Sequence, residues 1–334
     1  MTPALKSTAR RAPEIAAAGA NHVLARHGRS FYWASHLLSA QHASRAARLY
    51  RLCRHIDDLA DENSCVASAR SALASVAGSM LSGRSPDPLI QDGIALLQEC
   101  RIDPAVMLAL IHGVSSDLAL VRMADEASLI RYCYQVAGTV GLMMCQVLDT
   151  SDAAACAHAI DLGIAMQLTN ICRDVKADAL LGRRYLPASL VGALAPEALI
   201  DPSEALRPLL QRSVATLLRR ADDYYRSGES GLAFLPLRAR YAILVAARVY
   251  HAIGSRIRAR DHAYWQGRVV VSGSSKVRIT ARTLCAAPFR RMPWQAAPAH
   301  DASLHVALAG MLGADVPAAD VPAAPIAMVP ANAA

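Results

Sequence analysis

Two pairs of aspartates, each spaced four residues apart in an apolar helical context, constrain this chain more than any other feature. The first pair is Asp57 and Asp61, and the second is Asp174 and Asp178. Residues four apart share one helix face with Cβ atoms roughly 5–6 Å apart, so the paired carboxylates repel unless a cation lies between them. Mg²⁺ takes oxygen ligands and is often shared between carboxylates and phosphates. The pairs therefore predict two helices that face each other across a cavity and hold a diphosphate through bridging metal ions.

The composition indicates a helical protein with a sizeable core. The 334 residues are 54% hydrophobic but only 5% aromatic, and the abundant Ala, Leu and Arg favour helices. The net charge of +8 would attract anions such as phosphates, nucleic acid or an acidic membrane surface. Arginine is spread along the chain without dense blocks or interleaved aromatic residues, so nucleic-acid binding is not expected.

The eight cysteines contain no Cys-x-x-Cys pair and are scattered through apolar patterns. Their spacing is typical of buried, reduced thiols rather than of a zinc ribbon or a disulfide framework. The N-terminus has no apolar run of the signal-peptide type, and no stretch reaches the roughly 18 apolar residues of a spanning helix. We expect a cytoplasmic protein, with peripheral attachment to the inner face of the membrane as a further expectation.

Periodic apolar positions predict helices along most of the chain. Pro13 and Gly28 mark the first helix, and the others are expected at residues 42–62, 66–82, 88–100, 104–122, 127–149, 152–178, 203–227 and 238–260. Gly138 and Gly141 fall inside one helix, which indicates close helix packing or room for a substrate. Val269–Val271 is the only strand-like run.

The composition divides the chain into three parts. Residues 1–12 are small and basic without periodicity, which predicts a disordered N-terminus, and residues 13–291 are expected to form the folded domain. Residues 292–334 are rich in Ala and Pro, which predicts a largely disordered tail with a short apolar helix near Leu304–Leu312.

Several motifs in order resemble the squalene/phytoene synthase family over about residues 20–290. They are Ser30-Phe31-Tyr32, then Tyr50-x-x-x-Arg54-x-x-Asp57-Asp58-x-x-Asp61, then Tyr132-Cys133-Tyr134-x-Val136-Ala137-Gly138-Thr139-Val140-Gly141, then Gln167-Leu168-Thr169-Asn170-Ile171-x-Arg173-Asp174-Val175-x-x-Asp178, then Gly182-Arg183-x-Tyr185-Leu186-Pro187, Gly231-Leu232, Leu235-Pro236 and Arg268-Val269-Val270-Val271-Ser272. One Asp-x-x-x-Asp is a weak signal, whereas several ordered motifs are a strong one. Within the family, the likeness is greatest to bacterial phytoene synthases.

The resemblance implies an all-α, single-domain helical bundle of the isoprenoid-synthase type around a central cavity. It implies a head-to-head prenyltransferase that condenses two geranylgeranyl diphosphates through prephytoene diphosphate to phytoene, releasing two diphosphates, as the first step of carotenoid biosynthesis. The implied cofactor is Mg²⁺, with Mn²⁺ as the alternative, and no NADPH is expected. The implied partners are geranylgeranyl diphosphate, a membrane surface contacted peripherally and downstream carotenoid enzymes.

The predicted site combines both aspartate pairs with polar residues from the other motifs. Asp57, Asp61, Asp174 and Asp178 are the expected metal ligands and catalytic groups, and Asn170 lies one turn before Asp174 on the same face. Diphosphate or prenyl contacts are expected from Ser30, Tyr50, Arg54, Tyr134, Gln167, Asn170, Arg173, Tyr250 and Arg268. For Arg54 and Arg173, an ion pair with a neighbouring Asp is the alternative, and for Tyr185 a loop-anchoring role is as well supported as substrate contact.

One position departs from the family pattern. Many members carry Glu immediately before the last Asp of the second motif, and this chain has Ala177, preceded by Lys176. The missing carboxylate is expected to alter metal affinity.

Other functions fit parts of the pattern. A dehydrosqualene- or squalene-type synthase would use farnesyl diphosphate, and the depth of the cavity would decide between the two substrates. Head-to-tail elongases and terpene cyclases also carry Asp-rich helices, but not the flanking motifs. A non-catalytic relative acting as an assembly factor would have no need of all four aspartates.

Overall fold

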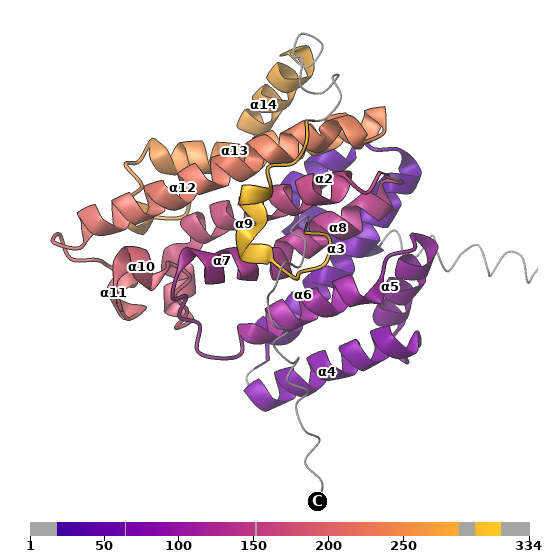
Figure 1. Ribbon diagram of the computed structural model, residues 1–334, viewed down its shortest axis with the longest axis horizontal. Helices are drawn as coiled ribbons and strands as arrows, with labels where there is room; N and C mark the ends of the chain where they lie inside the picture. The colour runs from indigo at the N-terminus through magenta and orange to yellow at the C-terminus, as the bar shows by residue number, and fades with distance from the viewer. Residues whose placement is uncertain (1–18, 64, 151, 287–297, 315–334) are drawn as a thin grey trace, which may run out of the picture.

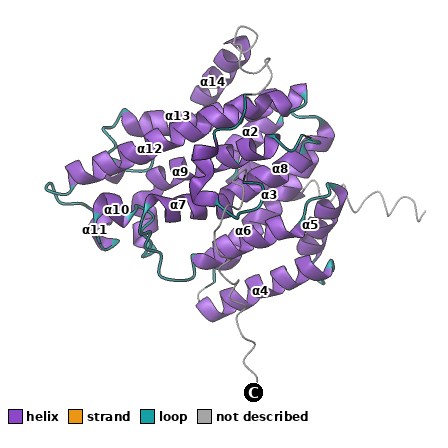
Figure 2. Cartoon of the chain, viewed as in Figure 1, coloured by secondary structure: helices purple, strands orange, loops and turns teal. Residues whose placement is uncertain are grey.

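A long helix, α9 (Ala155–Leu180), runs through the middle of the molecule, and α8, α12 and α13 pack against it (Figure 1). The structure, a computed structural model, describes residues 19–63, 65–150, 152–286 and 298–314. Within these residues the regular elements are all helices, joined by short loops (Figure 2). The all-α bundle expected from the resemblance is confirmed.

The remaining elements follow the chain around α9. They are α2 (Arg29–Ser35), α3 (Ala40–Asp61), α4 (Val66–Ser82), α5 (Pro88–Glu99), α6 (Pro104–Ser116), α7 (Glu126–Cys133), η1 (Tyr134–Gly138), α8 (Thr139–Val147), α10 (Ala188–Val191), α11 (Glu197–Ile200), α12 (Arg207–Ser230), η2 (Gly231–Phe234), α13 (Leu237–Arg258), η3 (Tyr264–Gln266), α14 (Gly273–Ala286) and η5 (Ala302–Leu308). Residues 19–27 are also helical and end at Gly28, as predicted.

Most predicted helices agree with the observed ones, and two differences matter. The helix expected at 127–149 is divided into α7 and α8 by η1, which is a π-helical turn. The strand-like reading of Val269–Val271 is wrong, because this run is irregular and no strand is described beside it to complete a ladder of hydrogen bonds.

Aspartates fix where several helices begin. Asp87 and Asp103 each precede a proline at the first helical position, where the missing N–H is not needed. Oδ1 of Asp87 accepts a hydrogen bond from the N–H of Leu89 at 2.7 Å, and Oδ1 of Asp103 accepts one from the N–H of Ala105 at 2.8 Å. These caps satisfy N–H groups that the helix itself leaves free.

Two glycines allow α9 to touch η1 and α8 backbone to backbone. A Cβ added at Gly141 would lie 2.1 Å from the carbonyl oxygen of Ala159, and one at Gly163 would lie 2.3 Å from that of Ala137. Gly141 also lines the central cavity. For Gly141, both interpretations, close packing and room beside a cavity, therefore hold, whereas Gly138 packs closely against Ile160 and does not line the cavity.

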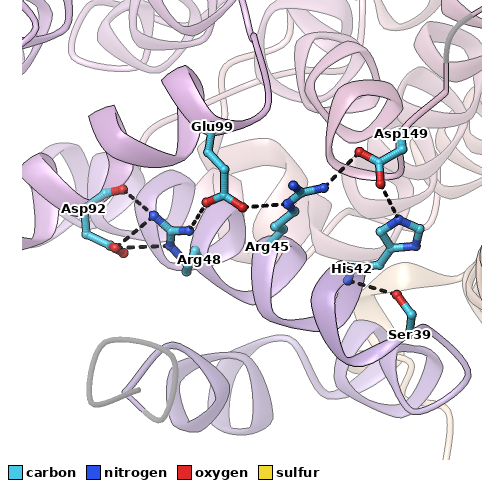
Figure 3. A network of polar contacts seen from close by, with 7 residues as sticks. All are labelled: Ser39, His42, Arg45, Arg48, Asp92, Glu99 and Asp149. Atoms are coloured by element: carbon cyan, nitrogen blue, oxygen red, sulfur yellow. Dashed lines mark hydrogen bonds and ion pairs between the residues drawn. The ribbon is translucent and has the colours of Figure 1, made fainter. Parts of the chain in front are cut away.

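A network of ion pairs ties α3 to α5 and to the turn after α8 (Figure 3). Arg45 contacts Glu99 at 2.8 Å and Asp149 at 2.9 Å, and Arg48 contacts Glu99 at 2.7 Å and Asp92 at 3.0 Å. Burial would raise the pKa of Glu99, but hydrogen bonds from both arginines outweigh it and lower that pKa. Each carboxylate of this network is thus matched by a cation.

The C-terminal segment, residues 298–314, packs against the helical core near α9 and is coloured yellow in Figure 1. Leu304 and Leu308 are buried, and the carbonyl oxygen of Leu304 accepts a hydrogen bond from Tyr224 at 2.8 Å. This stretch differs from the disorder expected for the tail, because its leucines bury apolar surface. The expected short helix is present as the 3-10 helix η5 but begins at Ala302.

The remaining expectations of disorder fall on residues 1–12, 292–297 and 315–334, which lie outside the described residues. None of the described helices is both long and apolar enough to cross a bilayer.

Candidate active site

A cavity of about 350 Å³ lies at the centre of the bundle. Helices α2, α3, α6, α8, α9, α12 and α13 contribute to its wall, together with η1 and η2. The wall is mainly apolar, and this volume is within the range of roughly 300–1,000 Å³ that is usual for ligand pockets. The prediction of a central cavity is confirmed.

Polar side chains enter this cavity from three helices. Tyr50 and Asp57 lie on one face of α3, Gln167 and Asn170 lie on α9, and Tyr250 lies on α13. All five were expected from the sequence to contact substrate or metal. An apolar cavity with a few polar groups suits a ligand that has a long hydrocarbon chain and a polar head.

The other three aspartates continue from the cavity along the same two helices. Asp61 lies one turn beyond Asp57, and Asp174 and Asp178 lie one and two turns beyond Asn170. Arg183 contacts Oδ1 of Asp61 at 3.1 Å, and its charge also lowers the pKa of Asp178. The structure therefore brings the two aspartate pairs together at one end of the cavity.

Asp57 and Asp178 carry their charges in an unfavourable environment. Burial raises the pKa of Asp57 to about 7, and the charge of Asp61 adds to the shift against the opposing effect of Arg54. Burial and the charge of Asp174 likewise raise the pKa of Asp178 to about 7. A cation placed between these carboxylates would relieve this cost.

Asp174 differs from these two because arginines surround it. Burial would raise the pKa of Asp174, but hydrogen bonds from Arg173 and Arg268 outweigh it and lower the pKa. Nε of Arg173 lies 2.9 Å and Nε of Arg268 lies 2.7 Å from Oδ1 of Asp174. Arg54 instead contacts Asp58 at 2.5 Å, which is the ion pair foreseen as its alternative role.

Sequence reasoning missed a fifth carboxylate of the site, Asp117, at the end of α6. Its oxygens accept hydrogen bonds from Tyr185 at 2.7 Å and from Tyr132 at 2.8 Å, and the two tyrosine rings stack at 4.9 Å. The charge of Asp117 raises the pKa of both Asp57 and Asp178. Tyr185 thus has an anchoring role, and no local motif around Asp117 signals its place beside the pairs.

Two predicted contacts lie elsewhere. Tyr134 does not line the cavity, and its hydroxyl donates to the carbonyl oxygen of Leu312 at 2.7 Å. Ser30 is half-buried on α2 and is also absent from the cavity wall. Both residues were expected from their place in the family motifs, and Tyr134 begins the π-helical turn η1.

The residues present fit a divalent metal ion. The donors are hard oxygens, and Oδ1 of Asn170 is buried without a hydrogen-bond partner although it lies one turn before Asp174. Burial and neighbouring carboxylates raise the pKa values of Asp57 and Asp178, so a cation bound here would offset an unfavourable charge. This donor set suits Mg²⁺ or Mn²⁺ rather than a soft metal.

Comparisons with known proteins agree with this geometry. The profile of the squalene/phytoene synthase family matches residues 24–275. A 15-cis-phytoene synthase of Enterobacter agglomerans is 36% identical over 262 residues, covering 75% of this chain and 88% of the relative. A phytoene synthase of Thermus thermophilus is 33% identical over 272 residues, covering 81% of this chain and 93% of the relative. A solved dehydrosqualene synthase, in complex with a ligand, has a TM-score of 0.75 at 24% identity and covers 83% of this chain and 98% of that one.

The helical bundle, its acidic cavity end and these relatives define a prenyltransferase-type enzyme. The chain belongs to the squalene/phytoene synthase family. The resemblance seen in the sequence motifs is thereby confirmed for the family, the fold and the enzyme class.

Proposed function

We propose that this enzyme is a phytoene synthase that condenses two molecules of geranylgeranyl diphosphate head to head. The observation that carries the proposal is the convergence of both aspartate pairs at the end of an apolar cavity. The similar enzymes named as phytoene synthases support the choice of substrate and product.

The aspartates and Asn170 would hold Mg²⁺ or Mn²⁺ and, through it, the diphosphate. When bound, the metal ion neutralises the charge that develops on the leaving diphosphate. Asp57, Asp61, Asp174 and Asp178 are the proposed ligands, and Oδ1 of Asn170 is free to bind the ion or its water.

Arginines at the same end would bind the diphosphate directly. Arg268 is exposed and now pairs with Asp174, and Arg183 pairs with Asp61. Once a cation neutralises these aspartates, the planar guanidinium groups can turn toward phosphate oxygens. Arg173 has the same relation to Asp174, and Arg54 would have to leave Asp58.

The apolar wall would hold the prenyl chains and exclude water from a carbocation. Tyr50 and Tyr250 line this space beside Asp57, and burial raises the pKa of Tyr50 to about 12, so its hydroxyl stays protonated. Asp117 fixes the hydroxyls of Tyr132 and Tyr185 near the same end.

Product analysis tests the proposal. Purified protein is incubated with Mg²⁺ and geranylgeranyl diphosphate, or with farnesyl diphosphate, without NADPH, and the organic extract is analysed by mass spectrometry. A C40 hydrocarbon from the first substrate alone is the expected result. A C30 product would instead make the enzyme a dehydrosqualene-type synthase, and absence of diphosphate release from both substrates would reject catalysis of this kind.

We also propose peripheral contact with an anionic membrane. The net charge is +8, and α14 exposes Val277, Arg278 and Arg282. Cosedimentation with anionic vesicles should be strong at low salt and weak at high salt, because screening reduces the attraction. Equal cosedimentation with neutral vesicles would contradict this.

A further inference from the structure

A second cluster of polar side chains lies where the C-terminal segment crosses α9 and α12. Nε2 of His305 lies 2.8 Å from Oδ1 of Asp161, and Nε2 of His300 lies 2.8 Å from Oδ2 of the same carboxylate. Asp161 and His305 are fully buried. Asp161 precedes Asp174 by 13 residues, which is roughly 20 Å along α9, so this cluster is separate from the aspartate pairs.

Two imidazoles and one carboxylate are also ligand types for zinc, but the geometry favours hydrogen bonds. A histidine that binds a metal through Nε2 normally donates its Nδ1–H to an acceptor. Nδ1 of His305 is buried without any hydrogen-bond partner. A neutral ring that donates Nε2–H to Asp161 leaves only a lone pair at Nδ1, which avoids burying an unsatisfied donor.

The cluster is linked to the wall of the central cavity through Ser227 and His158. Ser227 of α12 donates a hydrogen bond from Oγ to Oδ2 of Asp161, and its carbonyl oxygen accepts one from Nδ1 of His158 at 2.9 Å. His158 lines the cavity, and the ring of His300 packs edge-on against it at 5.3 Å. The C-terminal segment therefore contacts a residue of the wall directly.

The ring of His158 has little freedom on its other side. A Cβ added at Gly231 would lie 2.2 Å from the Cβ of His158, so η2 presses against this residue. Burial and the charge of a protonated His300 would both oppose protonation of His158 and lower its pKa, which keeps this part of the wall uncharged. An uncharged, closely packed wall suits an apolar chain.

Other contacts hold the same segment in place on both sides of the cluster. Tyr224 donates to the carbonyl oxygen of Leu304 at 2.8 Å, and Tyr134 donates to that of Leu312 at 2.7 Å. A Cβ at Gly313 would lie 2.8 Å from Leu142 of α8. The segment lies beyond residues 24–275, which are the residues that match the family profile.

We propose that the C-terminal segment supports the substrate-binding wall from outside the cavity, and that Asp161, His300 and His305 position His158 against the prenyl chain. His305 and Asp161 are positioning residues, since neither lines the cavity. This inference rests on the proposed function only in taking a prenyl chain as the occupant of the cavity.

The test compares full-length variants in steady-state kinetics with geranylgeranyl diphosphate. His305→Ala removes the hydrogen bond to Asp161 and should raise KM about tenfold with a much smaller change in kcat. His305→Gln keeps an N–H donor and should restore KM to within about threefold. The matched control is His42→Ala, which breaks a histidine–carboxylate pair with Asp149 in the network of Figure 3 and should leave KM unchanged.

A double-variant cycle with His158→Ala identifies the route of the effect. If the segment acts through His158, adding His305→Ala to His158→Ala should raise KM little further. Additive effects, a KM for His305→Ala equal to that of His42→Ala, or one equivalent of tightly bound zinc in the tag-free protein would each overturn the proposal. If the unmodified enzyme shows no turnover of geranylgeranyl diphosphate, the proposed function is rejected instead.

Discussion

The two faces of helix α3 place charges in opposite circumstances. On one face, Arg45 and Arg48 meet Glu99 and Asp92 of α5 (Figure 3). On the other, Asp57 meets further carboxylates; it follows Arg48 by nine residues, which is about half a turn of rotation. The charges of the first face are balanced by α5, where Glu99 has a lowered pKa. The pKa of Asp57 on the other face is instead raised to about 7.

This difference distinguishes charges that are paired within the fold from charges that we propose bind a metal ion and a diphosphate. Paired charges stabilise the folded state modestly, whereas clustered like charges destabilise it. A cluster that destabilises the free protein persists when a bound cation and phosphate use it. The four predictions below test this division, beginning with the largest effect.

Substitution of the proposed metal ligands should nearly abolish turnover. Asp57→Asn or Asp174→Asn should lower kcat with geranylgeranyl diphosphate by orders of magnitude, because a ligand for the metal and the diphosphate is lost. Helix content by circular dichroism should not change. The matched control on the balanced face is Asp92→Asn, which should stay within about twofold of the wild-type rate. Near-full turnover of Asp57→Asn at saturating Mg²⁺ would contradict the ligand assignment at that position.

Asp57→Asn should also stabilise the metal-free protein. The pKa of Asp57 is about 7 when folded and near 3.8 when unfolded, so the folded state binds the proton more tightly. Its contribution to stability is present below the unfolded pKa and is lost as pH rises through the folded pKa. The free energy of unfolding of Asp57→Asn should therefore exceed that of wild type by on the order of 1–3 kcal/mol at pH 8.

Urea unfolding with a chelator present, from pH 4 to pH 8, measures this effect. The advantage of Asp57→Asn should grow between about pH 4 and pH 7 and then remain constant. An advantage that is the same at both ends of this range would show that the charge of Asp57 is not the cause.

Substitution on the balanced face should instead lower the free energy of unfolding. Asp92→Asn leaves Arg48 and Arg51 without their shared carboxylate and should lower the free energy of unfolding by about 1 kcal/mol at pH 7. The measurement is urea unfolding, with an exposed Asp152→Asn as the control. Stabilisation by Asp92→Asn would remove the distinction between the two faces.

The smallest effect is expected at Asp117. Its charge raises the pKa of Asp57 and Asp178, so Asp117→Asn should move the acidic limb of the pH profile of kcat/KM to lower pH by a few tenths of a unit. Because its oxygens accept from Tyr132 and Tyr185, Asp117→Ala is the comparison that also removes both hydrogen bonds. An unshifted acidic limb in Asp117→Asn would show that the charge of Asp117 does not affect the pKa values of the site.

The sequence predicted the elements that follow regular periods. The helices, the two aspartate pairs and the cavity contacts of Tyr50 and Tyr250 all follow from 3.6-residue spacing or from motif order. Asp117 could not be found this way, because it stands alone after α6 and meets the pairs only through folding.

Two other differences have physical causes. Tyr134 was expected in the cavity from motif order, but its hydroxyl donates instead to the carbonyl oxygen of Leu312 in the C-terminal segment. Residues 298–314 have a composition typical of disorder, yet His305 finds Asp161, a partner 144 residues earlier in the chain. Composition describes a segment alone and says nothing of a distant partner.

The pairing of His300 and His305 with Asp161 also has a consequence for folding during synthesis. Asp161 leaves the ribosome well before His300 and His305, so its carboxylate remains hydrated while α12 and α13 are synthesised. At about 5–20 residues per second, that interval lasts roughly 7–30 s. Until then the edge of α9 and α12 that the segment covers is exposed to solvent. A chaperone would bind, or a misfolded contact would form, at this edge of the nascent protein.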